Sequence, residues 1–114
     1  MTPIIILTQL PSQEEAELIA HTLVTQKLAA CVHVFPKGKS TYIWEGQLYV
    51  SEEYHMQIKT LCSRFPEVSK TIRSLCSYDV PEIIFIKIDD GNAEYLKWLS
   101  LENAPQTSQE MNKS

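Results

Sequence analysis

The side chains best suited to hold a metal ion in this chain are three thiols and three imidazoles. Thiolate sulfur and imidazole nitrogen are the ligands that copper and zinc ions prefer. They belong to Cys31, Cys62, Cys76, His21, His33 and His55. No two of these residues stand at a chelating spacing within one loop, so a metal site would have to be assembled by the fold or by adjoining subunits.

Three of these side chains are better interpreted as structural. Cys31 lies inside an apolar run, where a cysteine usually serves packing alone. Cys62 borders a predicted helix, where burial is a better interpretation than ligation. His21 lies on another predicted helix without a partner in the sequence, which is typical of a solvated surface histidine.

The candidate metal ligand is Cys76, because it opens the polar segment that leads into Tyr78. Asp79 and Glu82 follow in the same segment and would add carboxylate oxygens, with residues of a neighbouring subunit completing the site. A thiol with carboxylates suits copper or another divalent cation. The sequence therefore predicts metal ligation by Cys76.

A second candidate site combines carboxylates, a lysine and aromatic rings from two distant parts of the chain. If a long hairpin and the segment before the last strand meet across a subunit interface, they would enclose a polar cleft with an aromatic wall. Such a cleft would suit a small anion, a metal ion or a metabolite. The predicted inter-subunit cleft residues are Trp44, Glu45, Lys59, Tyr78, Asp79 and Glu82. The alternative is structural: Trp44 packs in an interface, Glu45 is solvated, and Lys59 pairs with a neighbouring carboxylate.

Catalysis is the third hypothesis. A Cys–His–carboxylate set could be drawn from Cys31 or Cys76 with His33 and Glu82. The sequence has no Gly-rich phosphate loop, nucleophile elbow or HExxH motif to support such a set. We therefore predict that the protein is not an enzyme and expect no organic cofactor.

The element that must position these residues is a long β-hairpin predicted over residues 28–59. Residues 28–35 are a nearly unbroken apolar run, residues 40–44 are rich in β-branched and aromatic side chains, and Glu45-Gly46 supplies the reversal. The arms exceed the usual strand of about five or six residues. The hairpin should overhang the domain, and Val32, Val34, Ile43 and Ile58 cannot all be covered by two short helices, so association with other subunits is expected.

The other elements follow from apolar periodicity and end signals. A strand is predicted at residues 4–8, and a helix begins after Ser12, which forms a capping box with Glu15. A second helix starts near residues 63–66, a strand covers residues 83–88, and Asn92 caps a short helix. The predicted buried face of the first helix comprises Ala16, Ile19, Ala20, Leu23 and Val24.

This order predicts a single α/β domain over residues 1–103, an α+β sandwich with both main helices on one face of an antiparallel-rich sheet. Its elements would run βαββαβ, with a long central hairpin and an extra C-terminal helix. Residues 104–114 are polar and without periodicity, which predicts a mobile C-terminal tail.

The overall composition narrows the classes of partner. A formal net charge of −4 argues against binding to nucleic acid backbones, and no apolar stretch is long enough to span a membrane. The start of the chain lacks the features of a signal peptide. Three cysteines without a CxxC motif do not form a disulfide framework, so a cytoplasmic location is expected.

Four segments resemble the signature segments of the CutA divalent-cation tolerance family, in the family's order and with similar spacing. They are LAACV at 28–32, YIWEG at 42–46, YDVPEI at 78–83 and YLKWL at 95–99, and the resemblance covers roughly residues 4–101. It implies a ferredoxin-like fold, a homotrimer related in architecture to the PII signalling proteins, and a link to copper and other divalent metals.

The chain departs from the family pattern at two positions linked to metal. Where members commonly carry His-Pro-Tyr, with the histidine proposed to contact metal, this chain has Cys76-Ser77-Tyr78, which retains a soft ligand. Some members have a cysteine at the end of the first strand, where this chain has Thr8.

Residues and resemblance together predict a cytoplasmic homotrimer that binds divalent metal ions, copper especially, and contributes to metal tolerance. Its partners would be copies of itself and divalent metal ions. The alternative is a PII-like signalling or scaffold trimer, in which a small molecule or partner protein binds at the inter-subunit cleft.

Overall fold

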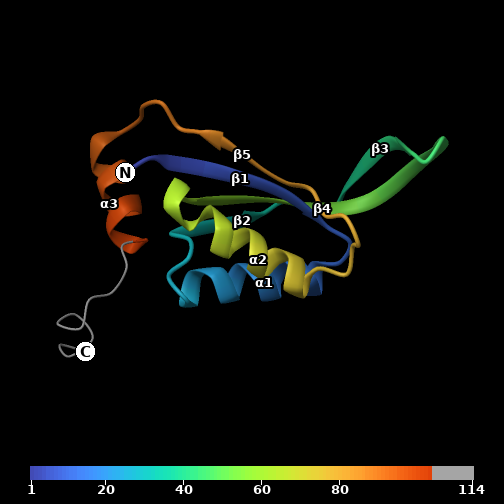
Figure 1. Ribbon diagram of the computed structural model, residues 1–114, viewed down its shortest axis with the longest axis horizontal. Helices are drawn as coiled ribbons and strands as arrows, with labels where there is room; N and C mark the ends of the chain where they lie inside the picture. Colours follow the sequence, from blue (N-terminus) through green and yellow to red (C-terminus); the bar gives the residue numbers. More distant parts are fainter. Residues whose placement is uncertain (104–114) are drawn as a thin grey trace.

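Five strands and three α-helices make up residues 1–103, the part of the chain that this computed structural model describes (Figure 1). The elements are β1 (Pro3–Leu10), α1 (Gln13–Thr25), β2 (Cys31–Val34), β3 (Gly38–Trp44), β4 (Gln47–Leu61), a 3₁₀ turn (Cys62–Arg64), α2 (Phe65–Leu75), β5 (Ile83–Lys87) and α3 (Ala93–Glu102). This order confirms the predicted βαββαβ arrangement with an extra C-terminal helix. The predicted mobile tail, residues 104–114, lies outside the described residues.

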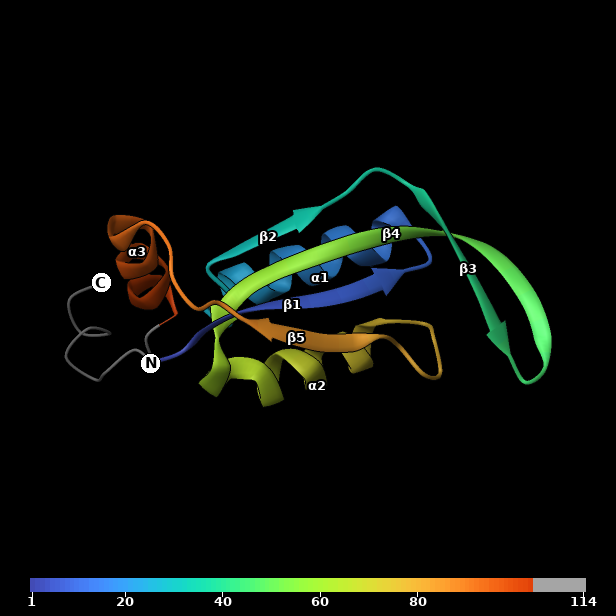
Figure 2. The same ribbon diagram turned by 90° about the horizontal axis from the view of Figure 1, so that it is seen from above.

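The strands form an antiparallel sheet in the order β2-β4-β1-β5, and β3 pairs with β4 alone (Figure 2). The 15-residue strand β4 has two halves. Its second half, Tyr54 to Leu61, pairs with β1, and its first half, Gln47 to Glu53, pairs with β3. One continuous strand therefore runs from the core of the sheet to the tip of the hairpin.

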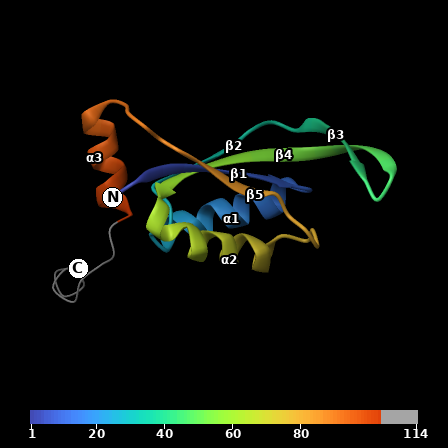
Figure 3. The same ribbon diagram turned by 45° about the horizontal axis from the view of Figure 1, so that its top comes forward.

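The helices α1 and α2 cover one face of the sheet, which confirms the predicted two-layer sandwich (Figure 3). Alternate residues of β1, namely Ile4, Ile6 and Leu10, are fully buried beneath them, as a half-covered strand requires. On α2, Val68 and Ile72 are buried at the spacing of one helical turn. No helix within residues 1–103 has the length and apolar character needed to cross a membrane.

One detail of the predicted packing is wrong. Val24 is predicted to be buried on α1, but its side chain is 41% exposed, because it lies about 100° around the helix from Leu23 and beyond the edge of the covered face. The prediction that Val32, Val34, Ile43 and Ile58 cannot all be covered by the helices is confirmed, because Ile43 is 71% exposed while Ile58 lies in the covered half of β4 and is fully buried.

The predicted strand at residues 28–35 begins only at Cys31. Lys27 adopts a φ of 61°, and the amides of Leu28 and Ala29 donate to the carbonyl of Leu23 at the end of α1. This turn satisfies carbonyls that the helix end would otherwise leave unpaired. The apolar character of Leu28 and Ala29 therefore reflects their burial beneath the end of α1 and not a strand.

The predicted helix caps are present. The Ser12 hydroxyl accepts the Glu15 amide at 3.2 Å, and Asn92 Oδ1 accepts the amides of Glu94 and Tyr95. The Glu15 carboxylate departs from a simple capping box, because it accepts the Ser12 hydroxyl at 2.9 Å and the amide of Ser77 at 2.6 Å. Glu15 thus connects the start of α1 with the segment that follows α2.

The helix α3 lies at the end of the sheet remote from the hairpin (Figure 1). It is anchored by the fully buried Asn103, whose amide nitrogen donates to Leu99 O at 2.8 Å. Asn103 Oδ1 accepts the Thr60 hydroxyl at 3.0 Å, and that hydroxyl also contacts Leu28 O at 2.7 Å. Arg64 Nε donates to the Asn103 carbonyl at 3.1 Å. These bonds connect α3 to β4 and to the start of α2.

The hairpin of β3 and β4 projects beyond the rest of the sheet, as predicted (Figure 2). Its turn residues Glu45 and Gly46 have φ values of 50° and 79°, the positive values of a type I′ turn. One face of the hairpin carries Tyr42, Trp44, Tyr49 and Glu53, which line a pocket. The other, here called the outer face, carries Ile43, Leu48 and Val50, exposed at 71%, 70% and 60%.

Candidate functional site

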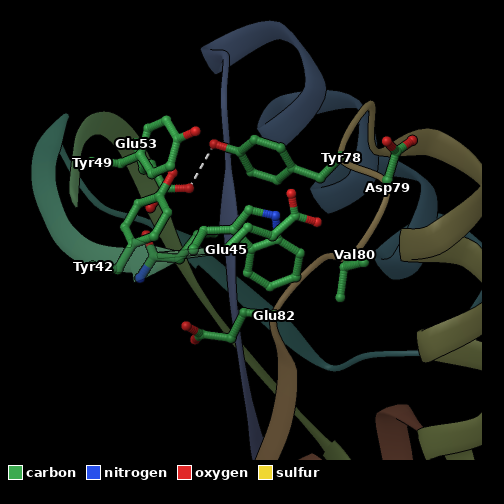
Figure 4. A pocket seen from close by; sticks show the side chains of 10 residues that line it. Tyr42, Glu45, Tyr49, Glu53, Tyr78, Asp79, Val80 and Glu82 are labelled. Atoms are coloured by element: carbon green, nitrogen blue, oxygen red, sulfur yellow. Dashed lines mark hydrogen bonds between the residues drawn. The ribbon is translucent and has the colours of Figure 1, made fainter. Parts of the chain in front are cut away.

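A pocket of about 640 Å³ lies between the β3–β4 hairpin and residues 78–82 (Figure 4). We call it the hairpin pocket. It is lined by Gln9, Tyr42, Trp44, Glu45, Tyr49, Glu53, Tyr78, Asp79, Val80 and Glu82. Residues from β1, from both arms of the hairpin and from the segment before β5 therefore meet at one place.

Five of the six residues predicted to line an inter-subunit cleft line this pocket: Trp44, Glu45, Tyr78, Asp79 and Glu82. They meet within a single chain. The sixth, Lys59, does not belong to the site: its Nζ donates to the Tyr95 hydroxyl at 3.2 Å and lies over the Tyr95 ring, beside α3. Lys59 follows Glu53 by six residues along β4, which places it about 20 Å from the pocket.

The prediction missed five lining residues, Gln9, Tyr42, Tyr49, Glu53 and Val80. Tyr42 and Tyr49 could have been predicted from the sequence. A two-residue turn at Glu45-Gly46 fixes the register, so Tyr42 must face Tyr49 directly across the hairpin. The two rings stack with centroids 5.7 Å apart. Gln9 gave no such signal, because it enters the pocket only through the pairing of β1 with β4.

A short hydrogen bond joins the two walls of the pocket. The Tyr78 hydroxyl donates to Glu53 Oε2 at 2.6 Å, and Figure 4 shows the phenol directed at this carboxylate. Burial raises the pKa of Tyr78 well above its ordinary value, and the hydrogen bond to Glu53 raises that pKa further. Tyr78 therefore remains a neutral donor that holds Glu53 in place.

The polar lining of the pocket is acidic. Four carboxylates belong to it, those of Glu45, Glu53, Asp79 and Glu82, and no Lys, Arg or His of residues 1–103 lines it. Asp79 lies on the far side of the pocket from Tyr42 and Tyr49 in Figure 4. A cavity whose charged side chains are all of one sign concentrates ions of the opposite sign. The pocket therefore favours cations and disfavours the small anion considered from the sequence.

The predicted metal ligand Cys76 does not face this pocket. Its side chain is buried in the core cluster beneath the sheet, and Sγ accepts the Tyr78 amide at 3.4 Å. Burial raises the pKa of the Cys76 thiol, and the nearby Glu15 and Glu53 carboxylates raise it further. A metal ion requires the thiolate, so Cys76 is a poor ligand in this conformation. Within residues 1–103, no three His, Cys, Asp or Glu side chains are grouped so that they could hold a metal ion.

The other predicted thiols and imidazoles are also dispersed. His21 is exposed on α1, as expected, and Cys62 packs against the core. Cys31 is half-buried in β2, while the His33 ring contacts Phe35 edge-on at 4.7 Å between centroids. Because no group of three such side chains forms in the described part of the chain, the hypothetical Cys–His–carboxylate set is not assembled.

Comparison with known proteins identifies the family. The model of the CutA1 divalent ion tolerance protein family matches residues 4–102. The chain is 40% identical over 95 residues to the divalent-cation tolerance protein CutA of Thermus thermophilus, covering 83% of this chain and 92% of that protein. It is 44% identical over 89 residues to the protein of the same name from Archaeoglobus fulgidus, covering 78% of this chain and 86% of that protein.

Solved structures agree with these sequence matches. The divalent cation tolerance protein of Thermus thermophilus superposes with a TM-score of 0.87 at 37% identity, covering 90% of this chain and 99% of that one. The CutA1 structure from Oryza sativa superposes with a TM-score of 0.88 at 32% identity, covering 93% and 97%. The ferredoxin-like α+β fold that the resemblance implied is therefore confirmed. The chain belongs to the CutA1 divalent ion tolerance protein family.

Proposed function

We propose that this protein contributes to the tolerance of divalent metal ions, copper in particular, by binding them as a cytoplasmic homotrimer. The observation that carries the proposal is its membership of a family named for divalent ion tolerance, over residues 4–102. The acidic lining of the hairpin pocket supports it, because carboxylates attract and ligate divalent cations.

The proposed ligands are carboxylates of the hairpin pocket and not the thiol of Cys76. Glu45 and Glu82 come from opposite walls, and neither makes a side-chain hydrogen bond or ion pair within residues 1–103 that would compete with a metal ion. A second subunit would complete the ligand set, because one chain does not group three ligating side chains within the described residues.

The proposed trimer would cover the outer face of the hairpin. Ile43, Leu48 and Val50 together expose apolar surface on a two-stranded ribbon that makes no sheet contacts beyond β4. A two-stranded ribbon of this kind is marginally stable in water unless another surface covers it. Association of copies through this face would remove that surface from solvent.

Copper titration of the reduced full-length protein tests the proposal, with metal content and oligomer mass measured on the same samples. The variants are Glu82→Gln, Cys76→Ser and, as a matched control, Glu94→Gln, which removes an exposed carboxylate outside the pocket. We expect stoichiometric binding that Glu82→Gln weakens by at least about tenfold and that the other two variants retain. The absence of specific binding by the wild type would contradict the proposed function. Loss of copper binding in Cys76→Ser would instead show that the Cys76 thiol is a metal ligand.

A second candidate function is that of a PII-like sensor or scaffold, in which the hairpin pocket binds a small molecule and a partner protein responds. The observation that favours it is the pocket itself: a volume of about 640 Å³ lined by four aromatic rings is in the size range of metabolite sites. A bare metal ion needs no such cavity.

A further inference from the structure

We propose that the hairpin pocket binds a small organic cation that carries an ammonium group. This inference rests on the second candidate function, a pocket for a small molecule, and names the chemical class of its ligand. It does not depend on metal binding. Three properties of the pocket carry it: the aromatic wall, the sign of the charged side chains, and the size.

The aromatic wall consists of Tyr42, Trp44, Tyr49 and Tyr78. A cation that lies within about 6 Å of such rings is attracted by their electron-rich faces, and ammonium groups are recognised in this way. Trp44 is 50% exposed, so its indole is open to a ligand and not committed to the core. The wall has rings on two sides, because Tyr78 belongs to the segment before β5 and the other three to the hairpin.

These rings are held in position before a ligand arrives. Tyr42 and Tyr49 stack at 20° between ring planes, and the Tyr42 hydroxyl lies 2.9 Å from Ser51 Oγ. Tyr78 is fixed by its 2.6 Å hydrogen bond to Glu53. Side chains that are already ordered lose little conformational entropy on binding. The pocket is therefore suited to a ligand that makes weak individual contacts with several rings.

The charged side chains disfavour two classes of ligand. An anion is disfavoured because the four charged lining residues are carboxylates and no cationic side chain among residues 1–103 accompanies them. A bare metal ion requires several ligating atoms at short distances, and one chain groups no three ligating side chains in its described part, so a metal ion would also need ligands from a second subunit. An alkylammonium ion has no coordination number to fill, so dispersed carboxylates and ring faces satisfy it.

The pocket has the dimensions of a metabolite site. Its volume of about 640 Å³ falls within the usual range for small-molecule pockets. An ammonium group could come from a free small cation or from a lysine side chain of a peptide, and the chemistry of recognition is the same. The volume of about 640 Å³ can enclose a whole small molecule, which favours the free cation, and the experiment separates the two sources.

The experiment titrates choline into the full-length protein in the presence of a chelator. The matched probe is 3,3-dimethylbutan-1-ol, which has the shape of choline without its charge. The Trp98→Phe background leaves Trp44 as the only tryptophan, so fluorescence reports the pocket alone. We expect saturable choline binding, with the neutral probe weaker by at least about tenfold.

Matched variants test the two components of the site. Glu82→Gln removes a pocket charge, with Glu94→Gln as the control outside the pocket, and Tyr49→Leu removes a pocket ring, with the similarly exposed Tyr95→Leu as its control. Each pocket variant should weaken choline binding by at least about fivefold, and each control should leave it within about twofold. Equal binding of the two probes, or equal effects of pocket and control variants, would overturn the inference.

Two further titrations on the same samples, with a lysine derivative and with copper, identify the source of the ammonium group and separate this inference from the proposed function. Binding of an acetylated, amidated lysine that is tighter than that of choline would overturn the assignment to a free small cation. Copper binding without choline binding would overturn this inference and leave the proposed function standing. Choline binding without copper binding would support the inference and contradict the proposed function.

Discussion

Thr8 carries the one buried side-chain oxygen or nitrogen of residues 1–103 that lacks a hydrogen-bond partner. It lies on β1 in line with Ile6 and Leu10, on the face that the helices cover. A buried hydroxyl without a partner loses its hydration without compensation. A family resemblance drew attention to this position, but only the three-dimensional structure shows that its hydroxyl is unpaired.

Thr8→Val should therefore stabilise the protein by about 1 kcal/mol, because valine keeps the shape and removes the unpaired hydroxyl. The matched control is Thr60→Val, since Thr60 is equally buried on a strand but its hydroxyl has two partners, at 2.7 Å and 3.0 Å. That control should lose about 1 to 2 kcal/mol. Urea unfolding measures the free energy of unfolding of both variants. A loss of stability in Thr8→Val as well as in Thr60→Val would show that the Thr8 hydroxyl is hydrogen-bonded in solution.

Glu15 makes one contact that a local sequence motif predicts and one that it does not. The spacing of Ser12 and Glu15 predicts the helix start, which the structure confirms. The bond from the Ser77 amide to the same carboxylate joins residues 62 positions apart, and no local pattern encodes it. Partial burial alone would raise the pKa of Glu15, but the bonds from Ser12 and Ser77 outweigh it and lower that pKa.

A lowered pKa gives Glu15 a definite effect on the pH dependence of stability. The ionised carboxylate stabilises the folded state above the unfolded pKa, and this contribution disappears as pH falls through the folded pKa. Glu15→Gln should cost about 0.5 to 1 kcal/mol at neutral pH, a modest value because water screens this partly exposed site. The difference from wild type should shrink as pH falls below the ordinary pKa of a glutamate and vanish once Glu15 is protonated in both states. Glu14→Gln, in the same helical turn but exposed, should show a smaller pH-dependent difference; an equal one would assign the effect to the helix dipole.

At the scale of elements, periodicity and end signals predicted the order of strands and helices correctly. The residues that were misassigned from sequence lie where tertiary contacts, and not local sequence, determine the structure. The run at 28–30 is apolar because it closes the end of α1, and Cys76 opens a loop while its side chain remains in the core. The anchoring of α3 belongs to this class, because Thr60, Arg64 and Asn103 are brought together only by the fold.

Asn103→Ala tests the anchoring of α3. It removes the bonds to Thr60 and to Leu99 O from a fully buried site, and it leaves a buried carbonyl without its partner. We expect a loss of about 2 to 3 kcal/mol in the free energy of unfolding. The control, Asn92→Ala, removes the exposed cap at the other end of the same helix and should cost about 1 kcal/mol. A smaller loss at Asn103 than at Asn92 would show that α3 is not held by this network.

At the scale of the whole molecule, the hairpin explains why the site could be predicted only in part. The turn and register of the hairpin follow from the sequence. The alternation of side chains along its strands therefore predicts which residues share the pocket face and which share the outer face. The position of the hairpin relative to residues 78–82 and to Gln9 could not be predicted in this way, because it depends on the curvature of β4 and on the order of the strands. The apolar outer face remains the principal support for the proposed trimer.

Replacement of a cross-strand pair tests that assembly. Ile43 and Leu48 are paired across the hairpin and point to the outer face. If copies associate as a trimer through the outer face, as proposed, the double variant Ile43→Lys/Leu48→Lys should lower the mass measured by light scattering to that of a monomer, because like charges would replace the apolar contact. Leu18→Lys, which alters an exposed leucine on α1, should leave the mass unchanged. A double variant that keeps the wild-type mass would place the interface elsewhere.

The continuity of β4 restricts how the hairpin can change in length during evolution. Successive side chains of a strand alternate between faces, so inserting one residue in an arm would exchange the pocket side chains for those of the outer face. Insertions or deletions that preserve both surfaces must therefore come as two residues in each arm. Each such step would move the tip by about 7 Å. Relatives with longer or shorter hairpins should differ in these steps, and a single-residue difference should be accompanied by a β-bulge.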